Sequence, residues 1–285
     1  IYDFSNTKQS LKLWEIELGI HHQEFPLPWD EPVPENKWDE AADYCANDVC
    51  ATEVLFYHLK EDWDARQVLS KLSGLTVNDR TNAHSERIIF GRDRHPQSKF
   101  NYIDLSEEFK GYEFNKFGKF DKERYNKNKD GESVMTSGKS IFMGDDPSEG
   151  GYVYYETGIY KNVALLDIAS LHPSTIEWLQ LFGPEYTARF SEVKSARVAI
   201  KHKAWDEARG YLDGALVQFL EGVEKLSEDE QQEVADSLSY AFKIVINSVY
   251  GCTSAPFPNA FKDPRNIDNI VAKRGALFMI LLKIK

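Results

Sequence analysis

The chain has 285 residues, of which 42% are hydrophobic and 28% charged, so it can form one large packed domain or two modest ones. A mean hydropathy of −0.50 and a longest apolar run of only 276–282 exclude an integral membrane protein, because a spanning helix needs about 20 apolar residues. The three cysteines show no CxxC spacing, which excludes a disulfide scaffold or a zinc ribbon and favours the reducing cytoplasm.

Apolar residues recur every three or four positions over 9–20 and 36–60, which predicts two helices in the first part of the chain. Four prolines between residues 26 and 34 predict an extended loop between these helices, because proline does not continue a helix. Residues 66–145 are mixed, and their polar stretch 115–131 predicts a loop.

The second half of the chain begins with a different pattern. The compact apolar run 163–168 has the length of a strand, and a helix is expected to follow from Pro173. Residues 185–222 are predicted to be largely helical. The run SEDE at 227–230 has the spacing of a capping box and predicts a helix that continues to about Tyr250. Two helices on either side of an acidic turn predict an antiparallel hairpin.

The net charge of −12 does not favour a nucleic-acid-binding protein, but the charges are segregated along the chain. Residues 27–65 and 206–236 are acidic, whereas the cations gather in two stretches. These cations are Arg189, Lys194, Arg197, Lys201 and Lys203, and then Lys262, Arg265, Lys273, Arg274, Lys283 and Lys285. Local potential attracts phosphate, so both stretches are candidate contacts. Charge alone favours the alternative, which is that they are ordinary solvated helix faces.

One candidate ligand residue stands at the end of the apolar run. Asp167 would be held rigidly there, and its carboxylate suits Mg²⁺, a cation that prefers oxygen ligands. The backbone N–H groups of the turn that follows, around 169–171, are placed to face an anion. The alternative is that Asp167 caps the next helix.

Two further groups lie on predicted helices. Lys243, Asn247 and Tyr250 fall at i, i+4 and i+7, so one helix face carries a cation for phosphate, an amide for hydrogen bonds and a ring for stacking. Arg197 and Lys201 also lie four residues apart, and they repel each other unless an anion lies between them. Taken singly, solvated cations and a satisfied asparagine are the alternatives.

These motifs together resemble a known family. DIASLHPS from Asp167, followed by KIVINSVYG from Lys243, is similar to motifs A and B of family B DNA polymerases of the bacteriophage type. SEGG at 148–151 resembles the Tyr-x-Gly-Gly segment that joins the exonuclease and polymerase domains in that family. Tyr44 and Asp48 have the Tyr-x-x-x-Asp spacing of the third exonuclease motif.

The resemblance implies an α+β fold. It would be part of a right-hand polymerase, with a palm sheet and a two-helix fingers hairpin, preceded by the C-terminal part of a ribonuclease H-like 3′–5′ exonuclease domain. The expected segments are 1–65 for the exonuclease part, 66–145 for a connection, 146–182 for the palm with motif A, 183–251 for the fingers with motif B, and 252–285 for the return towards the palm.

For the polymerase site, the resemblance implies that Asp167 is one of two aspartates that bind a pair of Mg²⁺ ions. Ser170, Leu171 and His172 would contribute to the nucleotide site. The expected nucleotide contacts from the fingers are Arg197, Lys201, Lys243, Asn247 and Tyr250. Lys243 would also count as catalytic, because neutralising the triphosphate is the main electrostatic task of such a site.

For the exonuclease, the resemblance implies that Asp48 is a metal ligand and that Tyr44 orients the attacking water. The implied function is template-directed DNA synthesis with proofreading. The implied partners are primer–template DNA, deoxynucleoside triphosphates and a processivity factor as a further candidate. The implied location is the cytoplasm of a host cell. The 76 residues between Asp167 and Lys243 leave little space for the insertion of protein-primed members, which favours an ordinary nucleic-acid primer.

Three departures from the family pattern stand out. His172 replaces the usual tyrosine, which puts sugar discrimination in doubt, and Ser148 replaces the tyrosine of the Tyr-x-Gly-Gly segment. The Asp-Thr-Asp motif and the first two exonuclease motifs are not found in the sequence. We therefore expect an internal fragment of a polymerase. The alternatives are a subunit of a split polymerase, a non-catalytic DNA-binding relic, or a soluble α+β domain with an incidental match.

Overall fold

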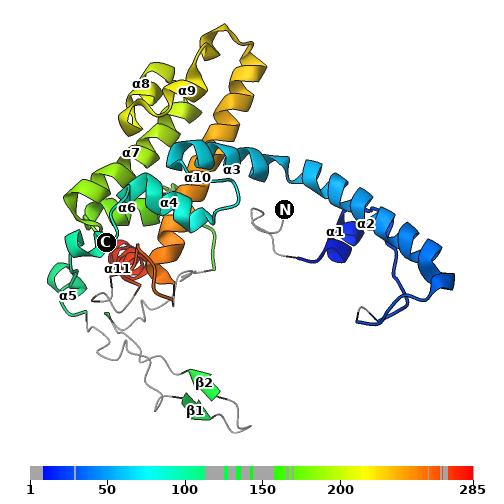
Figure 1. Ribbon diagram of the computed structural model, residues 1–285. Coiled ribbons are helices and arrows are strands. Elements are labelled where there is room, and N and C mark those ends of the chain that lie inside the picture. The colour runs from blue at the N-terminus through cyan, green and yellow to red at the C-terminus, as the bar shows by residue number, and fades with distance from the viewer. Residues whose placement is uncertain are drawn as a thin grey trace.

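A computed structural model gives the fold of most of the chain. It describes residues 9–28, 30–112, 125–127, 133–135, 142–143, 157–164, 167–168, 170–255, 257–263, 265 and 269–284. These residues are mainly helical, and two long helices form the upright hairpin that dominates the view in Figure 1.

The first half of the chain contributes short and medium helices. They are α1 (Leu11–Leu18), η1 (Glu35–Lys37), α2 (Trp38–His58), α3 (Lys60–Ser73), α4 (Thr81–Phe90), η2 (Pro96–Lys99) and α5 (Leu105–Glu108). The helices predicted over 9–20 and 36–60 are thus confirmed as α1 and α2, each slightly shorter than expected. In Figure 1, α1 and α2 project sideways from the hairpin, while α3 and α4 pack against it.

The second half forms the hairpin and a closing helix. Its elements are α6 (Leu171–Trp178), α7 (Gly183–Lys201), α8 (Trp205–Gly210), η4 (Leu212–Gly214), α9 (Val217–Leu220), η5 (Val223–Lys225), α10 (Glu228–Ser254) and α11 (Ile270–Ile284). Helices α7 and α10 are the two arms, α8 and α9 connect them at the top, and α11 crosses the base (Figure 1). The predicted antiparallel hairpin is therefore confirmed.

The predicted capping box at the start of α10 is also confirmed. The Ser227 hydroxyl accepts from the backbone N–H of Glu230 at 3.4 Å, and the Glu230 carboxylate accepts from the backbone N–H of Ser227 at 2.8 Å. These bonds satisfy N–H groups that a helix start otherwise leaves without partners. The Ser227 hydroxyl also donates to the Glu230 carboxylate at 2.7 Å. This bond, and then the bond from the Ser227 N–H, lower the pKa of Glu230 because they favour the ionised carboxylate.

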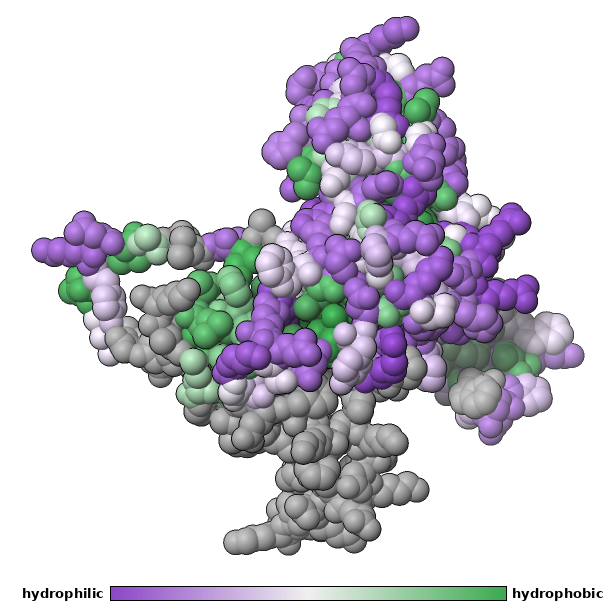
Figure 2. Space-filling model, turned by 90° about the vertical axis from the view of Figure 1, so that its left-hand side faces the viewer, coloured by the Kyte–Doolittle hydropathy of each residue, from purple (hydrophilic) through white to green (hydrophobic). Residues whose placement is uncertain are grey.

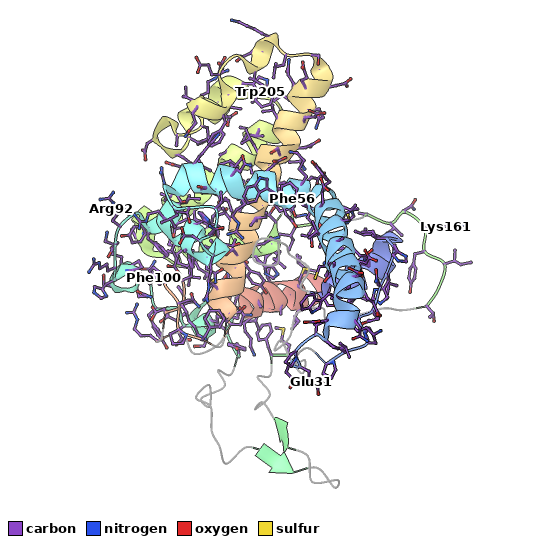
Figure 3. All side chains as sticks on the ribbon, turned by 45° about the vertical axis from the view of Figure 1, so that its right-hand side comes forward. Glu31, Phe56, Arg92, Phe100, Lys161 and Trp205 are labelled. Carbon is purple, nitrogen blue, oxygen red and sulfur yellow. The ribbon has the colours of Figure 1, made fainter. Side chains whose placement is uncertain are left out.

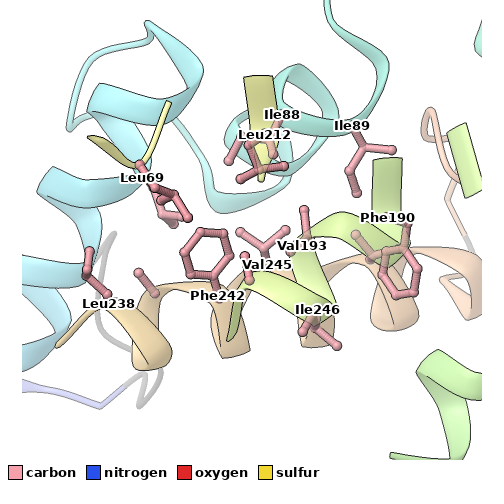
Figure 4. Packing of buried hydrophobic residues seen from close by; sticks show 14 of the residues in the cluster. Leu69, Ile88, Ile89, Phe190, Val193, Leu212, Leu238, Phe242, Val245 and Ile246 are labelled. Atoms are coloured by element: carbon pink, nitrogen blue, oxygen red, sulfur yellow. The ribbon is translucent and has the colours of Figure 1, made fainter. Parts of the chain in front are cut away.

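The main hydrophobic core lies between α10, α7, α3 and α4. Phe242 and Val245 of α10 are fully buried and face Val193 of α7 and Leu69 of α3, as the close view in Figure 4 shows. Outside this seam the surface of the hairpin is mainly hydrophilic (Figure 2). Burial of apolar side chains along the inner faces therefore holds the two arms in a fixed relation.

The expected α+β palm sheet is wrong for the part of the chain that the structure describes. The strands there are β1 (Tyr125–Lys127) and β2 (Ser133–Met135), which form one two-stranded antiparallel ribbon. Of the predicted strand 163–168, residues 163–164 and 167–168 are described, and they have no regular secondary structure. Val163 is 72% exposed, so the described start of this run does not lie in a buried central strand. A strand needs neighbours to pair with, and helices form the core instead.

The prediction of a ribonuclease H-like exonuclease part over residues 1–65 is also wrong for the described residues, because that fold is built on a sheet. Within the described residues before 66, the regular elements are helices, and no sheet supports them. The boundaries proposed for the five segments stay predictions. Among the described residues, no helix combines the length and the hydropathy that a bilayer span needs.

Candidate functional site

The residues predicted to contact a triphosphate gather at one hollow. This α7–α10 hollow has a volume of about 610 Å³ and is bounded by α7, α10 and the start of α3. Arg197 and Lys201 of α7 and Lys243 of α10 all line it. The i, i+4 spacing on α7 and the antiparallel course of α10 bring together cations that are more than 40 residues apart in sequence.

These three cations have no carboxylate partner among the described residues. The Arg197 side chain donates from Nε to the backbone oxygen of Ser239 at 3.3 Å, which fixes the guanidinium at the hollow. Lys201 and Lys243 are exposed, and the structure gives neither an ion pair. An anion that entered the hollow would therefore not have to displace an existing ion pair.

The rest of the predicted basic stripe on α7 has structural partners. The guanidinium of Arg189 lies 2.9 Å from a carboxylate oxygen of Asp213, and Lys194 lies 2.5 Å from Glu177. Lys203, just beyond the helix, pairs with Glu228 at the start of α10. Contacts between distant segments thus separate cations that stabilise the fold from cations that face the α7–α10 hollow.

Carboxylates also line this hollow, on both α3 and α10. They are Glu61, Asp64, Glu233 and Asp236. Asp64 is paired with Lys60 at 2.5 Å, and Asp236 accepts from Gln232 at 3.1 Å. The hollow therefore has an acidic rim near cations that remain free, and it is not uniformly positive.

A second hollow lies on the other side of Lys243. This α4–α10 hollow has a volume of about 520 Å³, and Lys243 and Asn247 line it together with Asn82 of α4 and Phe257. Tyr240 and Lys243 belong to both hollows, so the two are continuous along one face of α10. The sequence motifs did not point to Tyr240, although it lies three residues before Lys243 and so falls on the same helix face.

The two polymerase-like motifs meet at an aromatic stack. The rings of His172 and Tyr250 lie 3.8 Å apart with only 5° between their planes, so α6 and α10 touch where motif A and motif B were predicted. The Nδ1 atom of His172 is buried and has no hydrogen-bond partner, and burial lowers the pKa of this imidazole. The neutral ring is therefore favoured, which suits close stacking against the phenol.

The remaining motif A residues are not brought into either hollow. Asp167 is exposed and lies outside the lining of both. Ser170 takes a left-handed conformation before α6, and its side chain makes no cap bond. Leu171 is half-buried and packs near Gly275 of α11. The cations of α7 and α10 that were predicted to contact the nucleotide therefore lie together, whereas the motif A residues Asp167, Ser170 and Leu171 do not join them.

The described residues do not complete a metal centre around Asp167. Nowhere in the described ranges do three or more histidine, cysteine, aspartate or glutamate side chains come together as a group that could hold a metal ion. The resemblance implies that Asp167 shares the Mg²⁺ pair with a second aspartate from another motif, so this metal site stays a prediction.

The predicted exonuclease residues lie together on α2, away from the hairpin (Figure 1). Burial, the charge of Asp48 and a hydrogen bond to Asp48 raise the pKa of the Tyr44 phenol. The Tyr44 ring also packs on Phe25, with 5.8 Å between ring centroids. The helical spacing therefore brings Tyr44 and Asp48 together as predicted, and their exonuclease role stays a prediction.

Close to Tyr44 and Asp48, a buried carboxylate of α1 holds this helix against α2. Glu15 is fully buried and accepts from Asn47 of α2 at 3.1 Å, and His22 lies 2.7 Å from its second oxygen. The bond to Glu15 is the largest of the effects that raise the pKa of His22. This cluster fixes α1 against α2 and is not one of the residues that the motifs predicted.

Comparison of the chain with known proteins finds no related protein. No family model matches the chain, and neither the curated proteins nor the solved structures contain a match. The family resemblance therefore rests on the sequence motifs alone and stays a prediction.

Proposed function

We propose that this protein binds the triphosphate of a deoxynucleoside triphosphate in the α7–α10 hollow and takes part in template-directed DNA synthesis. The observation that carries the proposal is the meeting of Arg197, Lys201 and Lys243 at one hollow between two antiparallel helices. None of these three cations has a carboxylate partner within the described part of the chain. A triphosphate carries several negative charges, and charge-assisted hydrogen bonds from such cations are among the stronger polar contacts.

The packing of the hairpin supports this proposal. Phe242, one residue before Lys243, is fully buried against α7, and Ala196, one residue before Arg197, is buried as well. The cations therefore project from backbone that the core holds in place. Preorganised charge costs little reorganisation when a ligand arrives, which is the property that a triphosphate site needs.

The second support is the order of residues along α10. Lys243 is followed one turn later by Asn247, which lines the neighbouring hollow, and then by Tyr250 stacked on His172. A nucleotide with its phosphates at Lys243 would place its sugar and base towards Asn247. We propose that nucleotidyl transfer to a primer 3′-hydroxyl follows, and that 3′–5′ proofreading involves Tyr44 and Asp48.

Titration with a fluorescent N-methylanthraniloyl derivative of dATP tests the binding step. The variants Lys201→Ala and Lys243→Ala should each raise Kd about tenfold, which corresponds to about 1.4 kcal/mol. Lys203→Ala is the matched control, because Lys203 is a nearby cation that pairs with Glu228 outside the hollow. Its Kd should change less than twofold. Equal Kd values for all three variants and the unaltered protein would refute the assignment of the hollow.

A primer-extension assay then tests whether the protein is itself a polymerase or one of the alternative classes of protein. If the protein extends a primed template, Lys243→Ala should raise the dNTP concentration needed for half-maximal rate. Nucleotide binding without extension would instead identify the subunit of a split polymerase or a non-catalytic relic.

A further inference from the structure

A third hollow, on a different face from the α7–α10 hollow, is lined by three arginines. It has a volume of about 530 Å³ and lies between α4, the loop after α4 and the segment that follows α10. Arg87 belongs to the last turn of α4, and Arg92 and Arg94 belong to the loop. We call it the arginine hollow. The proposed function does not use it.

The end of α4 explains why these arginines face one hollow. Gly91 follows the helix with φ of +63°, a conformation that glycine adopts without steric cost, and its N–H donates to the backbone oxygen of Arg87. The chain therefore reverses immediately after the helix and brings Arg92 and Arg94 back beside Arg87. Figure 3 shows Arg92 projecting from this loop at the edge of the molecule.

None of the three guanidinium groups has an ion-pair partner among the residues that the structure describes, although carboxylates line the same hollow. Those carboxylates are engaged elsewhere. Asp79 accepts from the N–H and the hydroxyl of Thr76, both at 2.8 Å, and Asp93 accepts from the Tyr186 hydroxyl at 2.5 Å. The carboxylate of Glu86 is half-buried, and burial raises its pKa, which disfavours its charged form. The guanidinium N–H groups of the three arginines are thus left to bond an external anion, although the carboxylates in the lining offset part of their charge.

The arginine hollow adjoins the hollows already described. Both it and the α4–α10 hollow are bounded by α4 and by the segment after α10. Asn82 and Phe257 line the α4–α10 hollow, while the neighbouring residues Ala83 and Ala260 line the arginine hollow. Lys243 lines both the α4–α10 hollow and the α7–α10 hollow, and α4 contributes residues to both the α4–α10 hollow and the arginine hollow. The three hollows therefore form a series along α4 and α10.

An extended polyanion fits this series better than a single nucleotide does. Helix α4 has 10 residues and therefore spans about 15 Å, the rise of about four nucleotides in a strand of B-form DNA. The aromatic residue in the arginine hollow, Phe90, is only 4% exposed and packs in the core, so it offers no ring for base stacking. The hollow therefore presents charge to a backbone and no surface that reads bases.

We propose that the arginine hollow binds backbone phosphates of a nucleic-acid strand, independently of base sequence. That the partner is a nucleic acid rests on the proposed function. The phosphate chemistry itself rests on Arg87, Arg92 and Arg94 and stands without the α7–α10 hollow.

Fluorescence anisotropy with a labelled 20-nucleotide single strand of DNA, at NaCl concentrations from 50 to 200 mM, tests this proposal. The double variant Arg92→Ala/Arg94→Ala removes two exposed side chains and leaves the core intact. Lys110→Ala/Lys225→Ala is the matched control, because it removes the same charge from two exposed positions outside the hollow. Circular dichroism should give the same helical signal for both variants.

The arginine variant should bind the strand at least fivefold more weakly at the lowest salt concentration. The slope of log K against log salt should fall in magnitude by about 1.4, because each phosphate contact on a single strand contributes about 0.7. The control should shift both quantities by less than half as much. Equal values for the arginine variant and the control would overturn the proposal, as would no binding of the strand by the unaltered protein.

Nucleotide titrations distinguish the two proposals. Binding of the fluorescent dATP derivative should not change in the arginine variant. If that binding weakens while strand binding does not, the arginine hollow takes free nucleotides and the strand proposal is wrong. If Lys243→Ala leaves nucleotide binding unchanged but the arginine variant still loses strand affinity, the proposed triphosphate site fails and the arginine hollow stands.

Discussion

Phe242→Ala should destabilise the protein more than any surface change on α10. The ring is fully buried between the hairpin arms and α3, next to Leu69 and Val193 (Figure 4). Burying a phenylalanine removes about 200 Å² from water, which at about 25 cal/mol per Å² is worth about 5 kcal/mol at most. Alanine keeps part of that and leaves a cavity, so we expect a loss of about 3–5 kcal/mol.

Urea unfolding followed by circular dichroism measures this loss. A domain is typically stable by about 5–15 kcal/mol, so the variant should unfold at a much lower urea concentration. Phe242→Leu keeps most of the volume and should lose less than about 1.5 kcal/mol. Gln232→Ala, at an exposed position of the same helix, is the control and should stay within about 0.5 kcal/mol. A loss below about 1 kcal/mol for Phe242→Ala would refute the packing of α10 against α7 and α3.

Three further changes test other parts of the fold. Ser227→Ala removes the capping hydroxyl of α10 and should cost about 1 kcal/mol, read as a lower Tm in a thermal melt. Gly183→Ala should cost at least about 1–2 kcal/mol in urea unfolding, because φ is +74° and a β-carbon would lie 2.1 Å from a backbone carbonyl oxygen; an unchanged midpoint would contradict that contact. Cys45 and Cys50 are exposed, whereas burial raises the pKa of Cys252 to about 11. A thiol reagent at pH 8 should therefore modify two cysteines quickly and the third only on unfolding.

Local patterns in the sequence predicted the helical elements well. The capping box at Ser227, the prolines between 26 and 34 and the apolar periodicity of 36–60 each depend on neighbours within a few residues. The same holds for the shared helix face of Lys243 and Asn247, because helix geometry alone sets that spacing.

The prediction of a palm sheet was wrong because a sheet depends on contacts between segments that are far apart in the sequence. An apolar run such as 163–168 becomes a buried strand only when other strands pair with it, and periodicity does not reveal partners. The exposure of Val163 shows that this condition is not met in the described chain.

The sequence by itself determined where the helices of the hairpin lie and which side chains share a face, because both follow from backbone hydrogen bonds over three or four residues. Only the tertiary structure decided which cations are free. Lys203 is paired with Glu228 across 25 residues, whereas Lys201, two positions earlier, faces the α7–α10 hollow. The arginine hollow likewise depends on the chain reversal at Gly91 and on distant partners such as Tyr186, which draws Asp93 away. Charge pairing falls off over a few ångströms of space, so it follows three-dimensional distance and not sequence separation.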